Sequence, residues 1–103
     1  MIVDDTLSMR RRLGRVTVMA RAVARAQQLV SHLGAGAEIA VLRLARPTGP
    51  LAMLSRDARR VRAAVASLDP GYAHAAAAPA IGLAAQLLAS SSLQERHIFV
   101  ITD

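Results

Sequence analysis

Short apolar runs separated by helical patterns constrain the fold of this chain more than any other feature. The runs lie at 1–3, 38–44 and 97–102. The middle one contains Ile-Ala-Val-Leu, and a continuous apolar stretch of this length is typical of a strand buried on both faces. Such strands need helices above and below them. The pattern therefore predicts an α/β fold with a layered, mostly parallel sheet.

Three helices are predicted around these strands. Apolar residues recur at spacings of three and four from about residue 15 to 33, from 56 to 68, and in an alanine-rich segment from 75 to 90. A further strand at 51–54 follows a turn at 45–50 and pairs with the middle run at the sheet edge. The predicted order is strand, helix, strand, strand, helix, helix, strand.

Four residues mark the expected ends of these helices. Gly34 and its neighbour Gly36 end the first helix, as glycine commonly does just past a helix C-terminus. Ser55 is placed to cap the second. Pro79 falls in the first turn of the third, where no intrahelical hydrogen bond is lost.

Size and composition limit the classes of function. With 103 residues, the chain forms a single domain over 1–103. It contains no cysteine, which excludes disulfides, cysteine-zinc sites and thiol catalysis. The net charge is +6 and every basic residue is arginine. Because these arginines are spread over several helices, and Tyr72 and Phe99 are the only aromatic residues, we do not expect nucleic-acid binding.

The sequence shows no membrane or export signal. No apolar run reaches the roughly 20 residues that a membrane-spanning helix needs. Acidic residues follow Val3 directly and the basic block comes later, which is not the order of a signal peptide. The sequence therefore does not indicate the cellular compartment of the protein.

The acidic loop after the first strand holds the main candidate site. Asp4, Thr6 and Ser8 alternate, so one carboxylate and two hydroxyls can turn the same way. Hard oxygen ligands of this kind suit Mg²⁺, Mn²⁺ or Ca²⁺. Sites in such sheets lie beyond the carboxyl ends of the strands, where Asp5 and Asp103 also fall, so the topology can bring three carboxylates together there. Two alternatives are that the three side chains only cap the turn and the next helix, or that the acids form a phosphoryl-acceptor pocket.

The chain resembles the von Willebrand factor type A family, in particular its bacterial aerotolerance-regulator members. VDDTLSM is similar to the family's first metal motif, aspartate-x-serine-x-serine, with Thr6 replacing the first serine. LSRDARRVRAAVASLDPGY and AAPAIGLAAQLLASS are similar to its second and third helices, and HIFVITD to its fourth strand, ending at Asp103. The resemblance implies a three-layer α/β/α, Rossmann-like sheet, mostly parallel with one antiparallel edge strand.

The resemblance also implies a metal-ion-dependent adhesion site. Thr6 and Ser8 would bind the cation through their hydroxyls, and Asp4 and Asp103 directly or through water. A carboxylate of a partner protein would complete the coordination sphere. The expected function is therefore protein–protein interaction and not catalysis, with partner identity and oligomeric state open.

Two departures from the family pattern weaken this expectation. The family's threonine ligand falls at Ala75, which supplies no ligand, and the adjacent His74 is a poor match for Mg²⁺. The resemblance thus predicts a partial or vestigial site with weak or absent binding of Mg²⁺, Mn²⁺ or Ca²⁺. The family's last strands are also missing, so we expect a truncated domain.

Two further functions are kept as alternatives. A response-regulator receiver domain also begins with a strand that ends in paired acids. It needs a phosphoacceptor aspartate near its middle and a later lysine, whereas this chain has no lysine and Asp103 comes far too late. The other alternative is an inactive truncated gene product.

Overall fold

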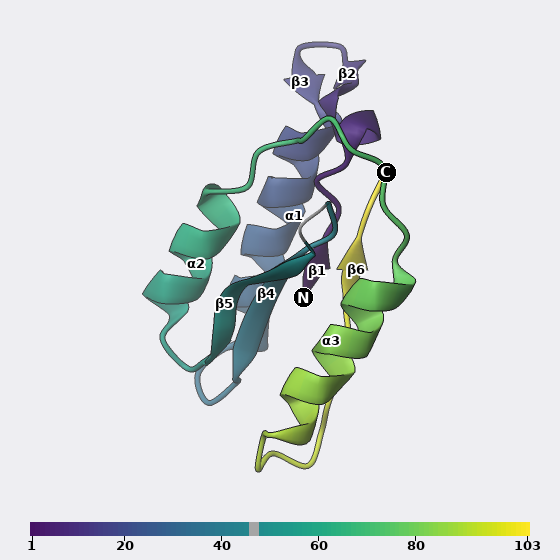
Figure 1. Cartoon of the computed structure of the whole chain (residues 1–103). Coiled ribbons are helices and arrows are strands. Elements are labelled where there is room, and N and C mark those ends of the chain that lie inside the picture. Colours follow the sequence, from purple (N-terminus) through teal and green to yellow (C-terminus); the bar gives the residue numbers. More distant parts are fainter. Residues whose placement is uncertain (46–47) are drawn as a thin grey trace.

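The computed structural model describes residues 1–45 and 48–103, and a four-stranded sheet forms its centre (Figure 1). The strand order is β5-β4-β1-β6. β1 runs parallel to both of its neighbours, and β4 pairs antiparallel with β5. The predicted sheet with one antiparallel edge strand is confirmed. The strands are β1 (Ile2–Val3), β4 (Ile39–Arg43), β5 (Gly49–Ser55) and β6 (Val100–Ile101).

Helices cover both faces of the sheet, which explains the continuous apolar run in β4. Successive strand residues point to opposite faces, so alternate residues enter two separate apolar clusters. Val3, Ile39 and Val41 pack with α1 and α2, while Ile2, Ala40 and Leu42 pack with α3. The predicted three-layer arrangement is therefore confirmed (Figure 1). The helices are α1 (Val18–Leu33), α2 (Ala58–Ala66) and α3 (Ala78–Ala89).

The helix starts follow ordinary capping chemistry, with one correction. Thr17 accepts a hydrogen bond from the Ala20 amide at 3.0 Å and begins α1. The cap of α2 is Asp57 and not the predicted Ser55, because the Asp57 carboxylate accepts hydrogen bonds from the free amides of the first turn. Ser55 instead accepts from the Asp57 amide at 3.0 Å. Pro79 lies in the first turn of α3, as predicted.

The segment between the acidic loop and α1 contains structure that the helical pattern did not predict. A 3-10 helix, η1 (Leu7–Arg10), is followed by a hairpin of β2 (Arg12–Leu13) and β3 (Val16–Thr17). Gly14 has a φ of 67° at the first loop position, where type II′ hairpin turns require glycine. The prediction of helix from residue 15 was therefore wrong. Figure 1 shows the hairpin at the end of the molecule where the C-terminal residue lies.

Other predicted boundaries shift by a few residues. β6 is shorter than the predicted strand over 97–102, although the Phe99 carbonyl still accepts from the Ile2 amide at 2.8 Å. β5 begins at Gly49, within the predicted turn. Residues 46–47 of that turn lie outside the described residues. In the described ranges, no helix combines the length and the apolar character needed to cross a bilayer.

We expect Met9→Ala to lower the free energy of unfolding by about 2–5 kcal/mol, because it leaves a cavity in the core. Met9 lies in η1, is fully buried and belongs to the cluster beneath α1. The matched control is Met53→Ala in β5, where the side chain is 57% exposed. Urea unfolding of both variants measures the difference. Equal losses would show that η1 does not contribute to the core.

Candidate functional site

Two consecutive aspartates at the carboxyl end of β1 contact different neighbouring strands. Successive side chains of an extended segment point in opposite directions. The Asp4 carboxylate turns toward the end of β6, where its Oδ2 accepts from the Thr102 hydroxyl at 2.6 Å. The Asp5 carboxylate turns toward the end of β4, where its Oδ1 accepts from the amides of Leu44 at 3.1 Å and Ala45 at 2.6 Å.

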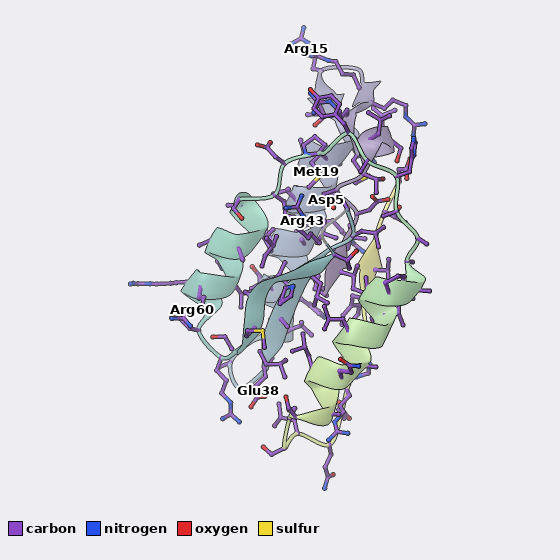
Figure 2. All side chains as sticks on the ribbon, in the orientation of Figure 1. Asp5, Arg15, Met19, Glu38, Arg43 and Arg60 are labelled. Carbon is purple, nitrogen blue, oxygen red and sulfur yellow. The ribbon has the colours of Figure 1, made fainter. Side chains whose placement is uncertain are left out.

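Asp5 is a structural residue, and its placement corrects the expectation that three carboxylates meet. Its Oδ2 accepts from Arg43 Nε at 3.0 Å and lies 2.9 Å from Arg43 Nη2 (Figure 2). The side chain is 1% exposed. All four contacts come from N–H donors, so this carboxylate ties the end of β4 to β1.

Asp4 belongs to a continuous network of oxygen-bearing side chains. Its Oδ1 accepts from the Thr6 amide at 2.9 Å and from the Thr6 hydroxyl at 2.6 Å. Thr6 Oγ1 lies 3.4 Å from Ser8 Oγ, and Thr102 Oγ1 lies 3.2 Å from Asp103 Oδ1. The structure thus brings together all four predicted site residues. We call the five residues Ser8, Thr6, Asp4, Thr102 and Asp103 the oxygen rim.

The capping interpretation explains one contact of the oxygen rim and not the others. The bond from the Thr6 amide to Asp4 stabilises the turn, as that interpretation expects. Thr6 is the N-cap of η1, yet its hydroxyl makes no capping hydrogen bond and points back to Asp4. The two hydroxyl groups next to Asp4 therefore converge on its carboxylate from both sides.

The Thr102 hydroxyl lies between the two carboxylates of the oxygen rim. A hydroxyl carries one proton, and Thr102 directs it to Asp4 at the shorter distance, 2.6 Å against 3.2 Å to Asp103. An oxygen lone pair of Thr102 then faces the Asp103 carboxylate. Arg11 Nη2 is 3.9 Å from Asp103 Oδ2 on a side chain that is 62% exposed, which makes a weak ion pair. Two carboxylates and three hydroxyls are a donor set that hard divalent cations accept.

Other residues predicted near the site stay outside the oxygen rim. Ala75 is partly buried and packs against the cluster under α3, and His74 is exposed. The loop before them closes over the acidic loop, since the Gly71 amide donates to the Asp5 carbonyl at 2.7 Å. In the part of the chain that the structure describes, no three Asp, Glu, His or Cys side chains surround one point. A cation here depends on the hydroxyl ligands.

Sequence reasoning missed two residues of this region, Thr102 and Arg43. Thr102 follows β6 directly and reaches Asp4 because the β1 and β6 strands pair in parallel with Val3 beside Ile101. Arg43 reaches Asp5 in the same way from β4, where it is paired with Val3. The sequence did carry a signal for both residues. Each has a hydroxyl or a guanidinium group at the end of a strand that lies next to the acidic loop.

Comparison with known families gives a match over the whole chain. The family described as von Willebrand factor type A domain matches residues 1–103. The search of curated proteins returned no match. The matched range includes both the acidic loop and the strand end that form the oxygen rim.

We expect Asp5→Ala to destabilise the fold by about 3 kcal/mol, since it leaves Arg43 and two strand-end amides without their acceptor. The Arg43 side chain is 33% exposed and can be rehydrated. The loss of stability therefore stays near the lower end of the range for a broken buried ion pair. The control, Asp57→Ala, removes an exposed helix cap and costs about 1 kcal/mol. Chemical denaturation compares the two, and a smaller loss for Asp5→Ala than for Asp57→Ala would contradict the structural role.

Proposed function

Because the chain belongs to the von Willebrand factor type A domain family, we propose that it is a protein-binding domain with a divalent-cation site at the oxygen rim. Domains of this family commonly mediate protein interactions. The observation that supports the site is the connection from Ser8 to Asp103 through one network of oxygen atoms. The proposed subtype is the bacterial aerotolerance-regulator type, which the motifs resemble.

The proposed ligands are the carboxylates of Asp4 and Asp103 and the hydroxyls of Thr6 and Ser8. When bound, Mg²⁺, Mn²⁺ or Ca²⁺ supplies a positive charge that attracts an oxygen ligand from a partner protein. Thr102 holds the Asp4 carboxylate in place through its 2.6 Å hydrogen bond. Asp4 and Thr6 are buried, while Ser8 and Asp103 are exposed. A partner would therefore approach from the Ser8 and Asp103 side.

The proposed affinity for the cation is weak. Ala75 provides no oxygen at the position that corresponds to the family's threonine ligand, and the affinity of an oxygen site depends on the number and charge of its ligands. Thr6 also donates its hydroxyl proton to Asp4. Its remaining lone pairs are the ones that a cation can use. The proposed role is binding and not catalysis.

A phosphoryl-acceptor role finds no comparable support. The Asp5 carboxylate is enclosed by Arg43 and two backbone amides. The chain contains no lysine, which a receiver site requires. The antiparallel pairing of β4 with β5 is likewise foreign to a receiver sheet.

We expect Mg²⁺ and Mn²⁺ to bind with a Kd on the order of 1 mM or weaker, within the range of weak oxygen sites. Asp4→Asn should abolish this binding, because it removes the charge of one of the two carboxylate ligands. The control is Asp69→Asn, which changes an exposed aspartate outside the oxygen rim. Mn²⁺ titration followed by electron paramagnetic resonance measures the bound fraction.

Two results would contradict this proposal in different ways. Tight, saturable binding by the unaltered chain would show that the site is complete without a threonine at residue 75. Binding that persists in Asp4→Asn, at an unchanged thermal midpoint of unfolding, would place the cation elsewhere.

A further inference from the structure

Four arginines lie beside the oxygen rim, and we call Arg10, Arg11, Arg12 and Arg15 the arginine surface. They belong to η1 and the hairpin, and all four are exposed. No acidic residue occurs between Asp5 and Glu38 in the sequence. Arg11 connects this surface to the oxygen rim through its 3.9 Å approach to Asp103. Figure 2 shows Arg15 at the hairpin end of the molecule, far from Arg60 on α2.

The positive charge of the arginine surface is largely uncompensated. Arg10 Nη1 donates to the Pro70 carbonyl at 2.8 Å, and its guanidinium carbon lies 4.2 Å from the centre of the Tyr72 ring. These contacts hold the guanidinium in place without neutralising it. Among the described residues, Arg10, Arg12 and Arg15 form no ion pair with a carboxylate. The surface therefore presents exposed cationic groups to a ligand, with Arg10 held in place.

Apolar side chains are interspersed with these arginines. Leu7 is 37% exposed, Leu13 41% and Val16 48%. They flank the arginines along η1 and the hairpin. Exposed apolar side chains combined with arginine are characteristic of protein-binding surfaces, where arginine is enriched and lysine is depleted.

We propose that the partner of this domain is an acidic segment of a protein that binds across the arginine surface. Its carboxylates would contact the guanidinium groups, and its apolar side chains would pack on Leu13 and Val16. The inference rests on the proposed function in one respect, since one carboxylate of the same segment would reach a cation at the oxygen rim. Charge complementarity supports this occupant, because the surface is cationic and a cation site also attracts carboxylates.

A nucleic acid fits the same surface less well. Stacking of bases on aromatic rings supports binding of single strands. The one ring at this surface, Tyr72, is already covered on one face by Arg10.

The test measures binding of a short fluorescein-labelled peptide of alternating glutamate and leucine by fluorescence anisotropy. R12E/R15E reverses two charges on the hairpin and should weaken binding about tenfold or more. The matched control is R59E/R60E, which makes the same charge change on exposed positions of α2 and should alter binding less than about twofold. R12K/R15K keeps the charge but loses the guanidinium groups, so it should weaken binding clearly less than R12E/R15E does.

Each further outcome decides one point. Equal weakening in R12E/R15E and R59E/R60E would show diffuse attraction to a cationic chain and would overturn the inference. Loss of binding in R12K/R15K to the same degree as in R12E/R15E would also overturn the inference. Tighter binding of a single-stranded DNA oligonucleotide with the same dependence on Arg12 and Arg15 would identify a nucleic-acid partner instead.

A chelator separates this inference from the proposed function. Peptide binding that depends on Arg12 and Arg15 but is unchanged by EDTA would support the acidic partner and count against the cation at the oxygen rim. Binding that EDTA abolishes, yet is equal in R12E/R15E and R59E/R60E, would support the cation and overturn the role of the arginine surface.

Discussion

The parallel pairing of β1 with strands on both sides is the constraint on which this structure depends. β1 consists of Ile2 and Val3 alone, yet it joins β4 and β6 into one sheet. Because both pairings are parallel, the carboxyl ends of the three strands meet at one edge. Segments near residues 4, 44 and 102 thereby become neighbours. The acidic loop and the last residue of the chain are brought together by this topology, with Arg11 close to both.

The different roles of Asp4 and Asp5 follow from the atoms that surround each carboxylate. Asp5 accepts from a guanidinium and two amides, whose N–H groups stabilise a negative charge but offer no lone pair to a metal. Asp4 accepts from the hydroxyls of Thr6 and Thr102, whose oxygens keep lone pairs that a hard cation can use. Two identical side chains in sequence thus serve different purposes, one as a tie between strands and one as a ligand in the proposed site.

The sequence was informative where its pattern depends on local periodicity. The apolar run in β4, the three helices and the Pro79 position follow from spacing and capping rules. The hairpin was missed because Val16 also fits the helical spacing of α1. Gly14 followed by Arg15 between Leu13 and Val16 was the contrary signal, since the flanking residues pair across a two-residue loop.

The candidate site could be predicted only in part. Asp4, Thr6 and Ser8 are local, and their convergence follows from alternation along the loop. The contribution of Thr102 depends on a register between strands almost a full chain length apart, which no local pattern fixes. The same holds for Arg43 of β4, which reaches Asp5 because it pairs with Val3 of β1.

Paramagnetic broadening of amide NMR signals by Mn²⁺ tests the central claim most directly, because it locates a weakly bound cation without requiring a partner. The account predicts that the amides of Thr6, Ser8 and Asp103 lose intensity first as Mn²⁺ is added, and that Asp4→Asn removes this selectivity. The comparison point is Glu38 at the opposite end of β4, a carboxylate that is paired with Arg56 at 3.1 Å. Strongest broadening around Glu38, or equal broadening along the whole chain, would contradict the claim.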